Sequence, residues 1–133
     1  MNIEFIDENK YVDKAEEIIE GLCHKRDDRG NIIPLVTTSK IRNILAIAAD
    51  IYDKMMQSNS DEFGNELASR IEYLRVRMIY EAGRDKSVKA FIYDANLLKY
   101  AKTIGNDKKK YQLFYHYLEA LIAFHRYKGA KEN

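Results

Sequence analysis

The side chains of this sequence that could do chemistry are cations. Residues 72–92 read EYLRVRMIYEAGRDKSVKAFI, a hydrophobic helical pattern interrupted by fixed positive charges. These charges lie on Arg75, Arg77, Arg84, Lys86 and Lys89. A cation on a helix surface either pairs with a nearby carboxylate or faces an anion such as a phosphate group. The sequence therefore leaves a choice between a solvated, paired surface and an anion-binding surface.

Three arginines form a row along the helix that this pattern predicts. At about 100° per residue they lie within about 40° of one another around the axis. They are Arg70, Arg77 and Arg84. One side of the row borders an apolar stripe of Leu67, Ile71, Leu74 and Met78. The other side borders a second strip of Tyr73, Val76 and Tyr80. We therefore expect a helix packed on both faces, with the arginines at the seam.

Acidic residues near the row allow a purely structural interpretation. Glu66 lies four residues before Arg70, and Glu81 is spaced from Arg77 and Arg84 as in helix ion pairs. Such pairs contribute only a few tenths of a kcal/mol, so they neither require nor exclude an anionic partner. Cations with fewer acidic neighbours keep the anion interpretation open; they are Arg75, Arg84, Lys86, Lys89, Lys99 and Lys102. Tyrosines between such cations suit phosphate contacts combined with stacking on a single strand.

The other chemically capable residues show no catalytic or metal-binding spacing. His24, His116 and His125 form neither an HExxH nor an HxH pattern. His116 and His125 lie about 180° apart on one helix, and we expect them on its surface or at an interface. Cys23 is the single cysteine, so no intramolecular disulfide can form and a structural thiol is expected. Without a glycine-rich phosphate loop either, the sequence predicts no enzyme, no cofactor and no metal.

Length and composition predict one globular domain. A chain of 133 residues with 46% hydrophobic residues has the size of an ordinary domain. We expect a single helical domain over 1–133, with an N-terminal helix and polar loop in 1–34 and a helical core in 35–129. The acidic start MNIEFIDENKY lacks the features of a secretory signal. No apolar run approaches the roughly 20 residues that span a bilayer, so we expect a cytoplasmic protein with no membrane partner.

Charge is distributed unevenly along the chain. Residues 1–69 hold 14 acidic and 8 basic side chains, whereas residues 70–133 hold 7 and 14. Such asymmetry favours an anionic partner for the C-terminal half. Folding could also bring the two halves together and neutralise the charge.

The hydrophobic periodicity predicts an all-α fold, a compact bundle of about five helices with short loops. The expected helices cover residues 12–23, 37–57, 62–82, 87–103 and 108–128. We expect Thr38 or Ser39 to cap the second helix, Gly83 to end the third, and Gly105 and Gly129 to end the last two.

The helix expected over 108–128 is apolar almost all round. A terminal helix of a small bundle has little room for complete burial, and such a helix is buried or lies at an interface. We therefore expect self-association or docking onto a larger partner, with Phe114, Tyr117 and Phe124 as anchors.

Three stretches together resemble the small helical subunit of the Csm (type III-A) CRISPR interference complex. They are LVTTSKIRNIL, EYLRVRMIYEAGRDKSVKAFI and FYHYLEALIAFHRYKG. The resemblance covers residues 35 to about 129, and residues 1–34 match little beyond their helical character.

The resemblance implies a non-catalytic subunit of the effector complex in antiviral defence. It would be present in several copies beside the guide-holding backbone subunits and the large subunit. It would contact the backbone of CRISPR RNA and target RNA, while RNA cleavage belongs to other subunits. The positions implied to contact RNA are Lys40, Arg42, Arg75, Arg77, Arg84, Lys86 and Lys89, with Arg126 and Lys128 as weaker candidates. One or two of them would be structural, Arg77 with Glu81 first.

A helical adaptor that self-associates through its C-terminal helix and has no RNA role is the alternative. The two hypotheses differ in the surroundings of the cations. An exposed row free of carboxylates favours RNA, whereas systematic pairing of arginine with glutamate favours the adaptor.

Overall fold

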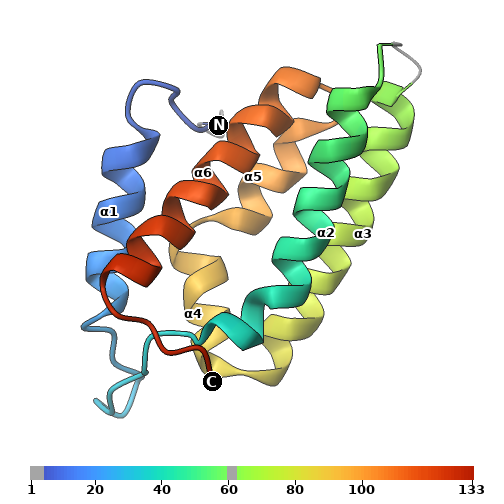
Figure 1. Ribbon diagram of the computed structural model, residues 1–133. Helices are drawn as coiled ribbons and strands as arrows, with labels where there is room; N and C mark the ends of the chain where they lie inside the picture. Colours follow the sequence, from blue (N-terminus) through green and yellow to red (C-terminus); the bar gives the residue numbers. More distant parts are fainter. Residues whose placement is uncertain (1–4, 60–62) are drawn as a thin grey trace.

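The computed structural model describes residues 5–59 and 63–133, and within these residues the chain forms six α-helices and no strand. The helices are α1 (Tyr11–Leu22), α2 (Thr38–Gln57), α3 (Phe63–Arg84), α4 (Lys86–Asp94), α5 (Leu97–Ile104) and α6 (Lys108–Tyr127). Figure 1 shows α2 and α3 side by side, with α6 and α5 next to them and α1 on the outer side of α6. The all-α class is therefore confirmed. The start expected for the third helix at Glu62 lies outside the described residues.

The helix expected over 87–103 is in fact two helices, which corrects the expected number from about five to six. α4 ends at Asp94, and Asn96 adopts the left-handed conformation with φ 58° before α5 begins. Asparagine tolerates this conformation better than most residues. Because apolar residues continue at helical spacing across the break, the sequence pattern alone did not reveal it.

The end of α3 also differs from the expectation. Gly83 lies inside the last turn, and α3 continues to Arg84. Gly83 is not among the glycines with positive φ, so it does not act as a left-handed terminator. Gly105 and Gly129 do have positive φ, at 59° and 86°, and they follow α5 and α6 as predicted.

The C-terminal tail closes the beginning of α2. Thr37 is the N-cap residue and its side chain makes no capping hydrogen bond. Instead, the backbone N–H groups of Thr38 and Ser39 donate to the carbonyl oxygens of Lys131 and Glu132, at 3.0 and 2.9 Å. The expectation that Thr38 or Ser39 would cap this helix was therefore wrong. Figure 1 shows the C-terminus beside the first turn of α2.

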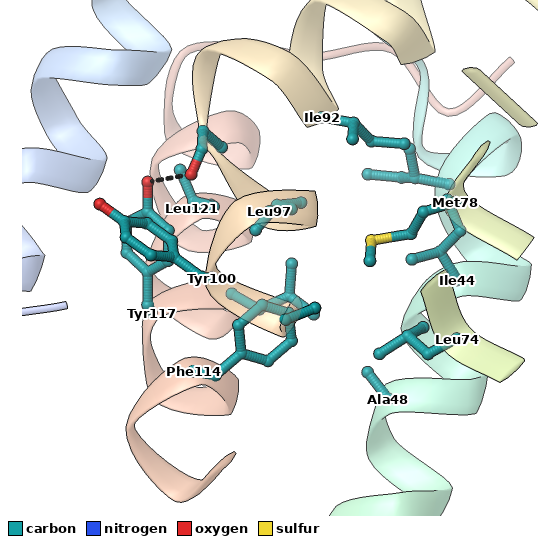
Figure 2. Packing of buried hydrophobic residues seen from close by; sticks show 14 of the residues in the cluster. Ile44, Ala48, Leu74, Met78, Ile92, Leu97, Tyr100, Phe114, Tyr117 and Leu121 are labelled. Carbon is teal, nitrogen blue, oxygen red and sulfur yellow. Dashed lines mark hydrogen bonds between the residues drawn. The ribbon is translucent and has the colours of Figure 1, made fainter. Parts of the chain in front are cut away.

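Helix α6 is covered by the rest of the chain on most of its surface, which explains why it is apolar almost all round. It packs against α1, α2 and α5 (Figure 1). The Tyr111 hydroxyl donates to the carbonyl oxygen of Ala48 at 2.6 Å, and the Tyr117 hydroxyl donates to that of Ala95 at 2.9 Å. Figure 2 shows Tyr117, Phe114 and Leu121 among the core residues that line this interior. The premise that a small bundle cannot bury its terminal helix was wrong, because α1 covers its outer side.

Helix α3 is packed on one face only. Its predicted buried stripe is confirmed, since Leu67, Ile71, Leu74 and Met78 are all buried. The second strip is exposed, however, with Tyr73, Val76 and Tyr80 each more than half accessible to solvent. The expectation of two packed faces was wrong because α2, α4 and α5 all contact α3 from the inner side of the bundle.

Candidate nucleic-acid interface

The arginine row on α3 is paired with glutamates of the same helix. Arg70 donates to Glu66 at 2.9 Å, and Arg77 donates to Glu81 at 3.0 Å. Arg84 lies 3.9 Å from Glu81 and is the most exposed of the three arginines. The ion pairs expected from the sequence are therefore present. The guanidinium groups of Arg77 and Arg84 also lie over the Tyr80 ring, 5.1 and 5.4 Å from its centre.

Arg75 is paired as well, although the sequence placed it among the cations with few acidic neighbours. Its Nη1 lies 2.7 Å from Glu72, which is three residues earlier on the helix. Only a quarter of its side chain is exposed, and its Nε is buried without a hydrogen-bond partner. Each arginine of α3 therefore has a glutamate partner on the same helix, and α3 taken alone has the character of a paired surface rather than an anion-binding one.

The two predicted lysines of α4 are much less constrained. Lys86 is 80% exposed, and its nearest carboxylate oxygen is that of Asp27 at 3.8 Å. Lys89 has no carboxylate partner among the described residues, and its ammonium lies 5.5 Å from the centre of the Tyr93 ring. Tyr93 is itself 55% exposed. Exposed cations beside an exposed aromatic ring can contact a phosphate and a base of one nucleic-acid strand.

Lys40 has a structural partner. Its Nζ lies 2.7 Å from Asp85 Oδ2 and thereby joins the first turn of α2 to the start of α4. Asp85 is the N-cap of α4, and its other oxygen accepts from the backbone N–H groups of Ser87 and Val88. Burial alone would raise the pKa of Asp85, but Lys40 and the hydrogen bonds from Ser87 and Val88 outweigh it and hold the pKa well below its usual value.

Asp85→Ala is expected to destabilise the protein by about 1–2 kcal/mol, because it removes the cap of α4 and leaves Lys40 without its partner. Urea denaturation at neutral pH measures the change. Since the pKa of Asp85 is lowered on folding, this contribution is complete above its ordinary value near 3.8 and is lost as the pH falls below it. Asp53→Ala, at an exposed position with no capping role, is the control. Equal stability of the two variants would contradict the prediction.

The remaining candidates from the sequence do not gather at one place. Lys128 Nζ lies 2.6 Å from Glu20 and ties the end of α6 to α1. Arg126 is exposed near the same end of α6. Arg42 is exposed on α2 and lines a groove between α2 and α6 together with Glu119. Of the nine predicted RNA-contact residues, Lys86 and Lys89 are the two that line one common cleft.

Sequence reasoning missed the cations of the loop that faces α4. Lys25, Arg26 and Arg29 line the same cleft as Lys86 and Lys89. Their signal was visible in HKRDDRGN, but the turn residues Gly30 and Asn31 and the following Pro34 made the segment read as a polar loop. Only the fold brings this loop to α4.

The aromatic anchors expected at an interface are mostly internal. Phe114 and Tyr117 are buried in the core of this chain, so as folded they present no surface to a partner. Phe124 is partly exposed, and its role at an interface stays a prediction. His125 is fully buried rather than on a helix surface or at an interface, because its ring fills the space between α6, Val36 and Phe91.

Two further findings concern metal and membrane. Across residues 5–59 and 63–133, no group of three or more His, Cys, Asp or Glu side chains is arranged to hold a metal ion. None of the helices in this part of the chain has the length and apolar character needed to cross a membrane.

Comparison with known proteins places the chain among related sequences. The sequence model of the family described as Csm2 Type III-A matches residues 10–131. The protein named CRISPR system Cms protein Csm2 from Streptococcus thermophilus is 40% identical over 126 residues, covering 95% of this chain and 96% of the relative. The protein of the same name from Mycobacterium tuberculosis (strain CDC 1551 / Oshkosh) is 33% identical over 125 residues, covering 94% and 96%. That from Enterococcus italicus is 29% identical over 119 residues, covering 85% of each chain. The match begins at residue 10, so it includes α1 and the loop before α2, which the resemblance seen in the sequence had left out.

Proposed function

The chain belongs to the Csm2 family of type III-A CRISPR systems, and on this premise we propose that it is a non-catalytic small subunit of an RNA-guided effector complex. In this role it contacts the backbone of guide and target RNA and helps to assemble the complex, in several copies, with the other subunits. Contacts to phosphates position RNA without reading its sequence. Sequence recognition is then left to base pairing between guide and target.

The observation that carries the proposal is the contrast between α3 and α4. The arginines of α3 are matched by Glu66, Glu72 and Glu81, whereas Lys86 and Lys89 extend from α4 with little or no neutralisation. Cations that are exposed and at most weakly paired lose little on meeting a phosphate, and they release counterions from the RNA. The RNA-facing surface therefore centres on α4 rather than on the arginine row.

Lys86→Ala and Lys89→Ala are each expected to weaken binding to RNAs of unrelated sequence by similar factors. Each should also reduce the slope of log affinity against log salt by about 0.7 for a single-strand phosphate contact. A salt titration with single-stranded and guide-paired RNA measures this, for the chain alone and for the chain with its partner subunits. Arg70→Ala is the matched control, because Arg70 already pairs with Glu66.

Loss of affinity for one RNA sequence but not for others would contradict backbone contact. No RNA binding in either setting, with normal assembly of the subunits, would instead favour a helical adaptor. The exposed strip of Tyr73, Val76 and Tyr80 on α3 supports that second candidate, since aromatic residues and arginine are enriched at protein interfaces.

A further inference from the structure

A cleft of about 640 Å³ separates the loop of residues 23–37 from α4. The loop contributes Lys25, Arg26 and Arg29 to its walls, and α4 contributes Lys86 and Lys89. These five cations come from segments about 60 residues apart in the chain. The cleft is therefore a product of the fold and not of a local basic run.

The loop has a defined shape before any ligand binds. Asp27 Oδ1 accepts hydrogen bonds from the backbone N–H groups of Arg29 and Asn31, both at 2.9 Å. The Asp27 N–H in turn donates to the Asn31 carbonyl at 2.8 Å. Gly30, with φ 81°, completes the turn, and Arg26 Nη1 donates to its carbonyl oxygen at 2.7 Å. A preformed turn of this kind holds cations in place without a large ordering cost on binding.

The carboxylates of the cleft do not cancel its charge. Three of them, Asp27, Asp28 and Asp94, face the five cations. Asp94 pairs with Lys25 at 3.2 Å. Asp27 uses one oxygen within its own turn, and its other oxygen lies 3.8 Å from Lys86 Nζ. Asp27 keeps a lowered pKa through its hydrogen bond from Asn31, although burial acts against it, so it remains a fixed anion. A net positive charge is left over.

Tyr93 gives the cleft a feature that a charged surface alone lacks. Its ring lines the cleft and also a second hollow of about 180 Å³ against α3, which Lys89 shares. More than half of the residue is exposed between the two hollows. An acidic peptide would need only the cations, whereas an unpaired base needs a flat aromatic face as well. The cleft thus has the two components that bind a single strand.

We propose that the cleft between the loop of residues 23–37 and α4 binds an unpaired segment of RNA. Its phosphates contact Arg26, Arg29, Lys86 and Lys89, and one of its bases stacks on Tyr93. This inference rests on the proposed RNA-contact function and adds two things to it. The loop before α2 becomes part of the site, and the RNA held there is single-stranded because both faces of a base inside a duplex are covered by neighbouring bases.

The test uses a single-stranded oligoribonucleotide that contains one 2-aminopurine, and the same strand annealed to its complement. Both are titrated into the full chain, alone and reassembled with its partner subunits. Tyr93→Leu is expected to weaken single-strand binding roughly fivefold or more and to abolish the quenching of 2-aminopurine that stacking causes. Tyr93→Phe should behave as the parent chain. Arg29→Ala should keep the quenching and reduce the salt slope by about 0.7.

Controls and contrary outcomes separate this inference from the proposed function. Tyr127→Leu, at an exposed tyrosine outside the cleft, should leave binding unchanged, and circular dichroism checks that each variant is folded. If Lys86→Ala weakens RNA binding while Tyr93→Leu and Arg29→Ala do not, the function stands and the cleft assignment is overturned. If none of the three variants changes binding, both are overturned. Displacement of the RNA by polyglutamate, to the same extent with Tyr93→Leu as with the parent chain, would assign the cleft to an acidic protein segment and also overturn the inference.

Discussion

Phe114→Ala is expected to lower the free energy of unfolding by about 3–5 kcal/mol, the usual cost of removing a buried aromatic ring. Phe114 lies on α6 with almost none of its surface exposed (Figure 2). Its ring centre is 5.8 Å from that of Tyr111. The free energy of unfolding of such domains is typically only about 5–15 kcal/mol, so the substitution would remove a large part of it. Urea denaturation followed by circular dichroism measures the change.

Tyr127→Ala is the control on the same helix, because Tyr127 is 81% exposed and surface substitutions usually change stability by about 0.5 kcal/mol or less. Light scattering at a protein concentration where both variants are folded gives the second readout. A core role predicts the same mass for Phe114→Ala as for the parent chain. A change in mass without loss of stability would revive the interface interpretation of this residue.

Phe114 also illustrates which parts of the fold the sequence could predict. The spacing of apolar residues located α2, α3 and α6 within a few residues, because each buries one stripe at helical period. The same spacing could not tell whether the second apolar face of α6 is covered by α1 or by another molecule. It could not tell either that the similar strip of Tyr73 and Val76 on α3 is left exposed. Both outcomes depend on how helices are arranged, which periodicity does not encode.

In the candidate site, too, contacts between residues close in sequence were predictable, and contacts between distant segments were not. Ion pairs within one helix, such as that of Arg77 with Glu81, were predictable because their spacing is local. The pairs of Lys40 with Asp85 and of Lys128 with Glu20 join different helices and were not. They give Lys40 and Lys128 structural partners, while contact of either lysine with RNA stays a prediction. The cleft beside α4 was equally out of reach, since it needs Arg29 of the early loop next to Lys86.

The two exposed surfaces suggest a division of tasks within the proposed function. The strip on α3 combines aromatic residues with arginines that are already neutralised by glutamates, which suits contact with protein. The side of α4 that carries Lys86, Lys89 and Tyr93 combines weakly paired charge with one exposed ring, which suits contact with RNA. Under the proposed function, the strip on α3 would face other subunits and the side of α4 would face RNA.

His125 fastens the loop before α2 to the end of α6. Its ring is fully buried, and Nε2 is hydrogen-bonded to the carbonyl oxygen of Val36, so Nε2 carries the proton in the neutral ring. Nδ1 is buried without a partner. The Phe91 ring lies edge-on at 6.3 Å. Burial lowers the pKa of His125, and the charge of Arg126 acts in the same direction, while the bond to Val36 opposes them.

Stability is therefore expected to fall as the pH drops below about 6.5, the ordinary value for histidine. Because the pKa of His125 is lowered on folding, the unfolded chain binds its proton first. The stability contributed by keeping His125 neutral is complete above about pH 6.5. It is lost toward acid pH, by up to about 1.4 kcal/mol for each unit by which folding lowers the pKa of His125. The ordinary pKa of Asp85 is near 3.8, so its contribution to stability is lost only at lower pH. Between pH 5 and pH 8 the loss caused by His125 can therefore be measured without that of Asp85.

His125→Leu tests this assignment, because leucine fills much of the same space but neither titrates nor donates. At pH 8 the variant should be less stable by about 1–3 kcal/mol, since the buried Val36 carbonyl loses its donor. Toward pH 5 the gap to the parent chain should narrow, because only the parent loses stability by protonation. Urea denaturation at several pH values measures the gap, with His24→Leu as the control at an exposed histidine. A gap that stays constant from pH 8 to pH 5 would show that another group causes the pH dependence, and it would leave His125 with its packing and its hydrogen bond to Val36 alone.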